Sequence, residues 1–323
     1  MSDLLVGKDL KKSFPRGGKI LKAVDGVSFT IRAGETLGLV GESGSGKSTL
    51  GRSILRLLEP DEGEIVFDGV DLRRLDGEAL RAKRREMQIV FQDPLASLHP
   101  QMSIGEAIAD PLVIHGVGTP AERREMVAEL LDTVGIGREF ISSFPHEFSG
   151  GQQQRIGIAR ALALRPRFIV CDEPVSALDV SIQAQIVALL LELKDKFGLS
   201  YLFIAHDLGV IKHVSDRIAV MYLGRIVQIA PRDELFRNPL HPYTKALISA
   251  VPKIPRDGRP TRRFETLKGE IPSSLDLPPG CRFHPRCPLA EPECRASEPE
   301  LSEVAPGHWV ACHLYPTRRR AVV

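Results

Sequence analysis

The stretch Glu35–Leu58, ETLGLVGESGSGKSTLGRSILRLL, decides the fold. Its apolar run Thr36–Val40 predicts a buried strand, and the periodic stretch Ser48–Leu58 predicts a helix. Between them, GESGSGKS at residues 41–48 satisfies the phosphate-loop pattern. A strand, a phosphate loop and a helix in this order predict an α/β protein that binds a nucleoside triphosphate. A glycine-rich turn without a ligand is the alternative, and the strand and helix on either side argue against it.

The residue types of this loop suit a triphosphate. The glycines let the backbone turn tightly with its N–H groups pointing inward, and the helix that follows adds the positive end of its dipole. Lys47 can reach the β- and γ-phosphates, and the Ser48 hydroxyl can bind Mg²⁺. The expected nucleotide contacts from this loop are Gly41, Ser43, Gly44, Ser45, Gly46, Lys47, Ser48 and Thr49.

Composition narrows the class of protein. The chain has 323 residues, is 43% hydrophobic, and nearly balances 43 Lys and Arg with 41 Asp and Glu, so no global charge favours nucleic acid. No stretch reaches the roughly 18 apolar residues of a membrane span, and the N-terminus lacks the pattern of a signal peptide. We therefore expect a cytoplasmic protein, in which cysteines are metal ligands or thiols rather than disulfides.

An acidic pair follows a second predicted strand. RFIV, Arg167–Val170, leads through Cys171 into Asp172 and Glu173. With a phosphate loop upstream, we expect Asp172 to hold Mg²⁺ directly or through water and Glu173 to polarise the attacking water. Cys171 is interpreted as a small buried hydrophobic residue.

A second anion-binding helix start lies in FSGGQQQRIGIARAL, residues 148–162. Ser149 and two glycines precede a helix predicted over Gln152–Leu164, so exposed N–H groups and a hydroxyl suit another phosphate. FSGGQ resembles the signature of the ATP-binding cassette (ABC) family, which is far more specific than a phosphate loop. The resemblance implies a signature that acts on the nucleotide of a partner chain through Ser149, Gly150, Gly151 and Gln152.

Further landmarks of that family follow in order. The resemblance implies that Phe14 stacks on adenine, that Gln92 in QIVFQDP is the Q-loop glutamine, and that His206 in FIAHDL contacts the γ-phosphate. SALD matches the D-loop through Ser176 and Asp179. The implied Mg²⁺ ligands are Ser48, Gln92 and Asp172, and the implied catalytic residues are Glu173, His206 and Gln92. Phe14 stands in place of the commoner tyrosine and Phe148 in place of leucine, and neither change removes a catalytic group.

The resemblance covers about residues 3–255 and implies the fold. The implied fold is that of an α/β P-loop NTPase with a RecA-like core, an antiparallel β subdomain and an α-helical subdomain over about 93–160. We expect an ABC nucleotide-binding domain at 1–255 and a small irregular cysteine-containing module at 256–323. The polar stretch Asp93–Glu147 reads as mostly helical, and in transporters of this family it forms a groove for membrane subunits.

The resemblance also implies the mechanism and the partners. In this family two nucleotide-binding domains close head to tail on ATP, and this chain carries one copy of each half-site. It therefore needs a second, homologous but distinct ATPase chain. Relatives that act on nucleic acid have very long coiled coils between the Q-loop and the signature. In this chain only 56 residues separate Gln92 from Ser149. A regulatory subunit without turnover would lack Glu173 or His206, so we predict a transport ATPase that does not bind nucleic acid.

Two further stretches point to a subfamily. GRIVQIAPRDELFRNPLHPYTKALISAVP at 224–252 and FQDPLASLHPQMSI at 91–104 resemble the ATPases of oligopeptide and dipeptide importers. The implied partners are two transmembrane permease subunits and an extracytoplasmic binding protein, with this chain peripheral on the cytoplasmic face of the cell membrane. Relatives of similar sequence serve nickel, glutathione or oligosaccharides, so these cargoes stay as alternatives.

Four of the five cysteines lie near the C-terminus. Their spacing is C-x5-C-x6-C-x17-C, and four thiolates suit a [4Fe–4S] cluster or a tetrahedral Zn²⁺. Zinc sites usually have shorter spacings, and members of the resembled subfamily carry [4Fe–4S] here, whereas plain thiols remain an alternative. The nearby His284, His308 and His313 are interpreted as ordinary surface residues, and a role as substitute ligands is the alternative. We expect a metal clip that folds a core-poor tail away from the ATP chemistry. The cluster ligands would be Cys281, Cys287, Cys294 and Cys312.

Overall fold

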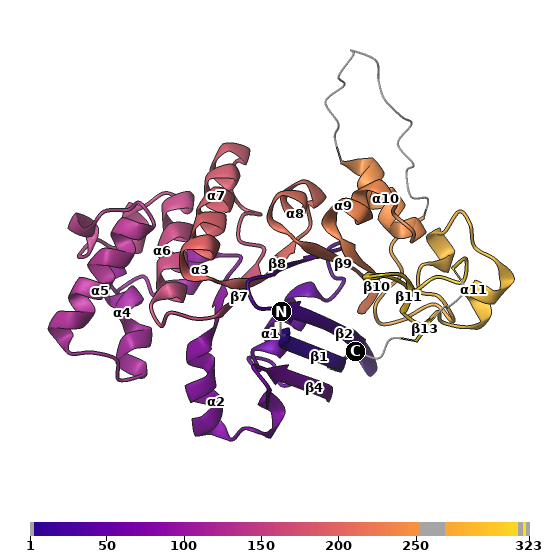
Figure 1. The fold of residues 1–323 in the computed structure, drawn as a ribbon, viewed down its shortest axis with the longest axis horizontal. Coiled ribbons are helices and arrows are strands. Elements are labelled where there is room, and N and C mark those ends of the chain that lie inside the picture. Colours follow the sequence, from indigo (N-terminus) through magenta and orange to yellow (C-terminus); the bar gives the residue numbers. More distant parts are fainter. Residues whose placement is uncertain (1–2, 252–268, 316–318, 321–323) are drawn as a thin grey trace, which may run out of the picture. The chain divides into compact units, whose positions relative to one another are not determined.

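The computed structural model describes residues 3–251, 269–315 and 319–320 of the chain (Figure 1). The domain boundary expected at 255/256 lies outside these described residues. The chain forms two compact units, each built from separate segments. Unit 1 comprises Met1–Leu5, Ile31–Thr36 and Phe67–Ala205, and unit 2 comprises Val6–Thr30, Leu37–Val66 and His206–Val323.

The phosphate loop of unit 2 is positioned by a buried strand. β3 (Thr36–Val40) is buried along its whole length, as the sequence predicts, and pairs in parallel with β9 (Arg217–Tyr222). β10 (Arg225–Pro231) continues the sheet antiparallel to β9. The helix after the loop, α1, spans Lys47–Ile54 and is shorter than predicted. It ends there because Arg56 adopts a left-handed backbone with φ of 50°, which a helix cannot continue.

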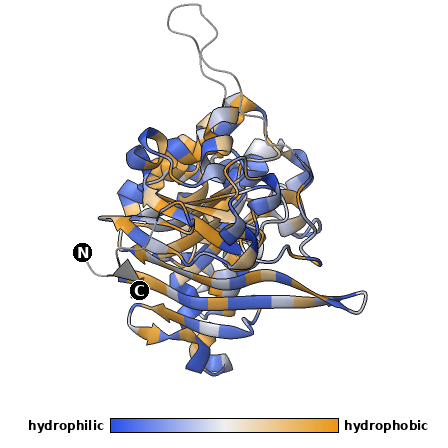
Figure 2. Cartoon of the chain, turned by 90° about the vertical axis from the view of Figure 1, so that its right-hand side faces the viewer, coloured by the Kyte–Doolittle hydropathy of each residue, from blue (hydrophilic) through white to orange (hydrophobic). Residues whose placement is uncertain are grey.

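Unit 2 also contains most of an antiparallel sheet, in which β2 (Lys19–Arg32), β1 (Asp3–Arg16) and β4 (Glu62–Phe67) neighbour one another in that order. β1 and β2 are joined by Gly17 and Gly18, whose positive φ angles of 57° and 77° suit a tight hairpin turn. Buried and less buried positions alternate along β2, and Figure 2 shows hydrophilic and hydrophobic residues alternating along the long strands.

Unit 1 combines parallel strands with helices. β7 (Phe168–Asp172) lies between β6 (Met87–Val90) and β8 (Ser200–Ala205), parallel to both, and its position confirms the strand predicted at RFIV. The stretch between β6 and β7 is mostly helical, as predicted. The helices of unit 1 are α2 (Gly77–Lys83), α3 (Pro94–Ser97), α4 (Ile104–Ile114), α5 (Pro120–Thr133), α6 (Gly150–Leu162) and α7 (Val180–Phe197).

Capping boxes fix the start of α4 and α5, and also of α6, which is described with the signature below. At α4 the Ser103 side chain and Glu106 cap each other's backbone, and at α5 Thr119 and Glu122 do the same. In the part of the chain that the structure describes, no helix is long and apolar enough to cross a membrane.

The described C-terminal residues 269–315, called the C-terminal module below, extend the sheet of unit 2. β12 (His308–Val310) pairs antiparallel with β10, and β11 (Ser302–Ala305) pairs with β12 and with β13 (Arg319–Arg320). The rest of the module is largely irregular, as predicted, apart from the turn η5 (His284–Arg286) and α11 (Pro292–Ala296). Besides α1, the described helices of unit 2 before the module are α8 (Leu208–Val214), α9 (Arg232–Arg237) and α10 (Pro242–Ala250).

Candidate nucleotide-binding site

The glycines of the phosphate loop are required by its backbone. Gly44 and Gly46 have φ angles of 76° and 103°, which residues with a Cβ rarely adopt. A Cβ on Gly46 would lie 1.9 Å from the Ala23 carbonyl oxygen, and one on Gly41 would lie 2.1 Å from the Met221 carbonyl oxygen. The loop therefore reaches its shape only because no side chain stands at these positions.

The loop also positions its own lysine. The buried Lys47 ammonium donates hydrogen bonds to the carbonyl oxygens of Gly41 at 2.8 Å and Glu42 at 3.1 Å. The Ser45 backbone N–H donates to the Glu42 carbonyl, and the Ser45 hydroxyl oxygen is buried without a hydrogen-bond partner among the described residues. Ser48 and Thr49 follow in the first turn of α1, and the N-terminus of a helix favours a bound anion. This geometry suits a phosphate group.

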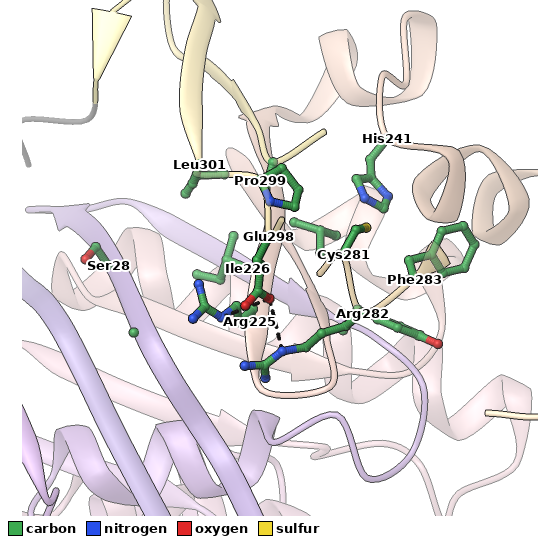
Figure 3. A pocket seen from close by; sticks show the side chains of 14 residues that line it. Ser28, Arg225, Ile226, His241, Cys281, Arg282, Phe283, Glu298, Pro299 and Leu301 are labelled. Atoms are coloured by element: carbon green, nitrogen blue, oxygen red, sulfur yellow. Dashed lines mark ion pairs between the residues drawn. The ribbon is translucent and has the colours of Figure 1, made fainter. Parts of the chain in front are cut away.

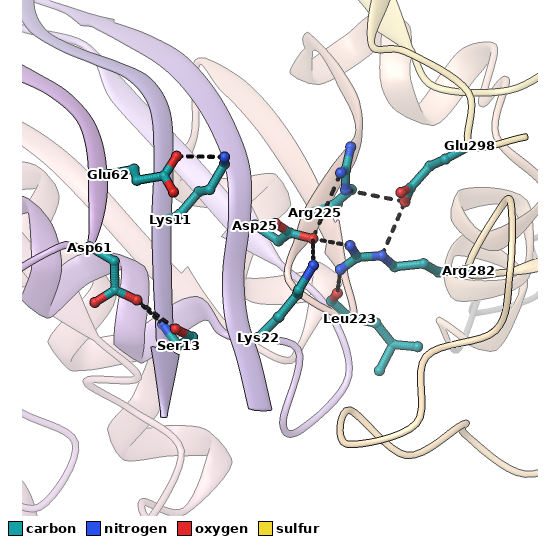
Figure 4. Close-up of polar contacts among 10 residues, drawn as sticks. All are labelled: Lys11, Ser13, Lys22, Asp25, Asp61, Glu62, Leu223, Arg225, Arg282 and Glu298. Atoms are coloured by element: carbon teal, nitrogen blue, oxygen red, sulfur yellow. Dashed lines mark hydrogen bonds and ion pairs between the residues drawn. The ribbon is translucent and has the colours of Figure 1, made fainter. Parts of the chain in front are cut away.

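Two further predicted ATP contacts belong to unit 2. Phe14 lies near the end of β1, half-buried, with the Lys12 ammonium 5.5 Å from the centre of its ring. Asp61 fixes Ser13, the residue before Phe14, because Asp61 Oδ2 accepts hydrogen bonds from the Ser13 N–H and hydroxyl at 2.7 and 2.6 Å (Figure 4). His206 is exposed and directly precedes Asp207, the N-cap residue of α8.

The acidic pair of unit 1 has an unusual backbone. Asp172 ends β7 and is only 1% exposed, whereas Glu173 adopts a left-handed backbone with φ of 47°. The Glu173 N–H donates to the carbonyl oxygen of Ile204 on β8, which holds the turned residue in place. Such strain is characteristic of functional positions.

Unit 1 brings three predicted residues together. The Gln92 side-chain amide donates to Glu173 Oε2 at 3.1 Å and to the Ser176 hydroxyl at 3.5 Å, and that hydroxyl donates to the Glu173 carbonyl. The Q-loop and D-loop residues therefore both contact the expected catalytic glutamate. Asp179, the other D-loop residue, precedes α7 and is exposed.

The signature segment differs in part from the expectation. The Ser149 hydroxyl accepts a hydrogen bond from the Gln152 N–H, and the Gln152 side chain accepts one from the Ser149 N–H at 2.9 Å. Both groups of Ser149 therefore cap α6, which starts at Gly150 rather than at Gln152. This outcome was readable in the sequence, because S-x-x-Q before a helix is a capping box. Gly150 and Gly151 form the first turn, where amides lack partners within the helix.

The four C-terminal cysteines lie near one another but form no metal site for a single ion. Burial, with smaller contributions from the charges of the other three cysteines and against a lowering backbone hydrogen bond at Phe283, raises the pKa of Cys281 to about 11. The thiols are therefore close enough to interact electrostatically. Even so, no three His, Cys, Asp or Glu side chains in the described residues are placed to hold one metal ion. The arrangement does not fit the tetrahedral Zn²⁺ that we kept as an alternative.

The histidines near the cysteines have other roles. His308 was expected at the surface, but it is 1% exposed and its Nε2 lies 2.8 Å from the side-chain amide of Gln228. The expectation is wrong because β12 pairs with β10 and brings His308 into the sheet of unit 2. His284 and His313 contact the backbone carbonyls of Cys281 and Ser297.

The C-terminal module is anchored in unit 2 by buried charges. The Arg282 side chain pairs with Asp25 of β2, lies 3.0 Å from Glu298, and donates to the Leu223 carbonyl (Figure 4). A cavity of about 150 Å³ lies beside this network; Figure 3 shows Cys281, Phe283 and His241 among the residues that line it.

The module also contacts the phosphate loop, which the sequence did not predict. Arg286, next to Cys287, forms an ion pair with Glu42 of the loop at 2.7 Å. The expectation that the module lies away from the ATP chemistry is therefore wrong. The reason is that Phe283, directly before η5, packs against Tyr222 and Tyr243, and the Tyr243 hydroxyl accepts a hydrogen bond from the Glu42 N–H of the loop.

A phosphate loop, a strand ending in Asp-Glu, and a glycine signature that opens a helix define a P-loop nucleoside triphosphatase of the cassette type. Comparisons with known proteins give the family. The ABC transporter family model matches residues 24–176, and that of the oligopeptide/dipeptide transporter C-terminal region matches residues 227–294. The chain belongs to the ATP-binding subunits of ABC transporters and carries the C-terminal region of the oligopeptide/dipeptide group. It is an ABC transporter ATPase with the fold that the sequence predicted.

Two curated relatives are similar over nearly their whole length. The chain is 54% identical over 316 residues to the oligopeptide transport ATP-binding protein AppF of Bacillus subtilis, covering 95% of this chain and 96% of the relative. It is also 54% identical to the putative oligopeptide transport ATP-binding protein YkfD of the same organism, covering 97% and 95%.

Solved structures support the fold. A dimeric post-hydrolysis state of the ATP-binding cassette MJ0796 bound to ADP and Pi has a TM-score of 0.65 and 33% identity, covering 71% of this chain and 98% of that one. The structure of cbiO1 from Clostridium perfringens, part of an ABC transporter complex, has a TM-score of 0.65 and 26% identity, covering 74% and 92%.

Proposed function

We propose that this chain hydrolyses ATP to drive the import of dipeptides and oligopeptides. The observation that carries the cargo class is the match of residues 227–294 to the oligopeptide/dipeptide transporter C-terminal region. The names of AppF and YkfD, which match 95% and 97% of this chain, support it. Turnover is supported by Glu173, which is present and held by the Gln92 amide at 3.1 Å.

The proposed roles follow the sequence assignments. Lys47 and the loop N–H groups bind the β- and γ-phosphates, and Asp172 and Ser48 hold Mg²⁺. Glu173 accepts a proton from the attacking water, and Gln92 orients the Glu173 carboxylate through their hydrogen bond. His206 contacts the γ-phosphate, and Phe14 stacks on the adenine.

The signature is proposed to act on the ATP of a second chain. Gly150 and Gly151 would donate N–H groups to the γ-phosphate bound by the partner, with Ser149 and Gln152 holding the helix end in shape. The dimeric structures of the similar cassette MJ0796 support this arrangement. We propose that the partner ATPase is homologous but distinct.

The remaining partners are two transmembrane permease subunits and an extracytoplasmic substrate-binding protein. The chain would then lie at the cytoplasmic face of the membrane as a peripheral subunit. This proposal rests on membership of the ABC transporter family and on the helical stretch Asp93–Glu147, where such subunits dock in transporters of this family.

We also propose that the four C-terminal thiols hold a [4Fe–4S] cluster. Each thiolate of such a cluster binds a different iron, so the sulfurs need only lie near one another and not converge on one point. The charges of other cysteines contribute, after burial, to the raised pKa values of Cys281 and Cys312, which supports a location of the four thiols near one another. Iron, sulfide and zinc analysis of anaerobically purified protein tests it: four irons and four sulfides per chain are expected, and their absence would refute it.

Uptake by cells tests the function. In a strain that lacks the native gene, the wild-type chain should restore uptake of a labelled tripeptide, whereas Lys47→Ala should not, because the ammonium that binds phosphate is removed. Lys8→Ala, on an exposed lysine of the same unit, is the control and should restore uptake. Restored uptake of Ni²⁺, glutathione or an oligosaccharide without peptide uptake would assign one of the alternative cargoes.

A further inference from the structure

Glu42, the second residue of the phosphate loop, is held at each of its polar groups. Its N–H donates to the Tyr243 hydroxyl at 2.9 Å, and its carbonyl accepts from the Lys47 ammonium at 3.1 Å. Its two carboxylate oxygens accept from the two terminal nitrogens of Arg286 at 2.7 and 2.9 Å. The conformation of Glu42 is therefore coupled both to the lysine that binds phosphate and to the C-terminal module.

Arg286 is fixed where it meets the loop. Its side chain is only 6% exposed, and it ends the turn η5, whose Arg286 N–H donates to the Phe283 carbonyl. The Phe283 ring packs edge-on against Tyr222 at 5.3 Å and lies 5.5 Å from Tyr243, between ring centres. A bidentate Arg–carboxylate pair with both partners anchored in this way is geometrically specific as well as strong.

The pairing has an electrostatic consequence. A carboxylate in a phosphate loop repels the polyanion that the loop binds, and the repulsion is stronger where burial lowers the dielectric. The Glu42 side chain is 24% exposed, so water screens its charge only in part. The Arg286 guanidinium cancels that charge. Without it, the loop would present an unpaired anion beside the triphosphate.

We propose that Arg286 of the C-terminal module is a positioning residue for the phosphate loop, which it serves by neutralising and orienting Glu42, with Tyr243 fixing the Glu42 backbone. The module therefore sets the ATP affinity of its own chain. The inference rests on the proposed binding of ATP by this loop. It differs from a purely anchoring role, because an anchor would not depend on the charge at position 42.

A double-mutant cycle on the full-length chain tests the proposal, with the ATP dissociation constant as the readout. Arg286→Met should weaken ATP binding about tenfold, within the range of coupling between linked sites. In the Glu42→Gln background the same substitution should change the constant by less than about twofold, because no carboxylate remains to be neutralised. Arg286→Lys should restore part of the affinity, since it returns the charge without the two-pronged geometry. Arg295→Met, an exposed arginine of the same module, is the matched control.

The outcomes separate the proposal from its alternatives. An equal loss in both backgrounds would show that Arg286 only holds the module in place, and an unchanged constant for Arg286→Met would overturn the proposal outright. A wild-type chain that does not bind ATP would instead refute the proposed function.

Tyr243→Phe gives an independent test should Arg286→Met fail to fold. It keeps the packed ring and removes only the acceptor of the Glu42 N–H. We expect ATP binding to weaken by roughly threefold, the worth of one hydrogen bond. An unchanged constant in a folded Tyr243→Phe chain would contradict the proposal.

Discussion

Replacing Arg282 with methionine should release the C-terminal module from unit 2. The Arg282 side chain is 7% exposed, pairs with Asp25 and Glu298, and donates to the Leu223 carbonyl. Methionine fills much of the same volume but removes the cation that pairs with Asp25 of β2. The substitution thus leaves Asp25, whose side chain is 10% exposed, without its buried cation and with only the weaker ion pairs to Arg225 and Lys22.

The size of the effect follows from this burial. Removing one partner of a buried ion pair costs about 3–5 kcal/mol in the free energy of unfolding. The neighbouring Arg225 and Lys22 lie 3.7 Å from the Asp25 carboxylate and keep the cost towards the lower end. The urea midpoint for unfolding of the module should therefore fall by roughly 1 M or more.

The chain offers a local probe for this measurement. Trp309 is its one tryptophan and lies in β12, paired with Ile229 of β10. Urea titration followed by tryptophan fluorescence reports on the module, and Arg295→Met serves as the exposed control. A midpoint for Arg282→Met equal to that of the control would refute the reasoning. Adding Asp25→Asn to Arg282→Met should recover part of the loss, because the carboxylate that lost its buried cation is then gone.

Three further predictions concern the loop and the module. Gly46→Ala should abolish ATP binding measured by equilibrium dialysis, because its Cβ would lie 1.9 Å from a backbone oxygen, whereas Gly77→Ala, which meets no atom within 4 Å, should bind normally. Burial opposes ionisation of Asp25, yet the hydrogen bond and charge of Arg282 hold its pKa below the ordinary 3.8. Since the folded-state pKa is the lower one, the contribution of Asp25 to stability is complete above about pH 5 and is lost as the pH falls through the folded pKa. The urea midpoint followed by Trp309 fluorescence should therefore fall less steeply on acidification in Asp25→Asn than in the wild-type chain. Cys287→Ser should weaken ATP binding as Arg286→Met does. Normal ATP affinity in a Cys287→Ser chain whose module unfolds at a lower urea concentration would contradict the proposed coupling between the module and the phosphate loop.

The parts of the fold that sequence predicted best are governed by local patterns. The apolar run Thr36–Val40 became a buried strand with the predicted ends, and Cys171 is fully buried as expected. The helix after the phosphate loop was predicted too long, because periodicity continues past Arg56 although the backbone there is left-handed. Hydrophobic spacing does not register such a single-residue change.

The candidate site was predictable as a set of residues and not as a set of contacts. The bond between Gln92 and Glu173 joins positions 81 residues apart, and that between Glu42 and Arg286 joins positions 244 apart. Neither separation leaves a periodic signal in the chain. The burial of His308 was missed for the same reason, since it depends on β12 joining a strand that ends at Pro231. How the predicted residues of the two units act on one nucleotide stays a prediction.

Phosphate release from ATP by the wild-type chain and by Glu173→Gln, each with its partner ATPase, tests the central claim most directly. The account predicts that both bind ATP with similar affinity. It also predicts that Glu173→Gln releases phosphate at least about 100-fold more slowly, because the group that accepts the proton of the attacking water is lost. Release at the wild-type rate by Glu173→Gln would contradict the account.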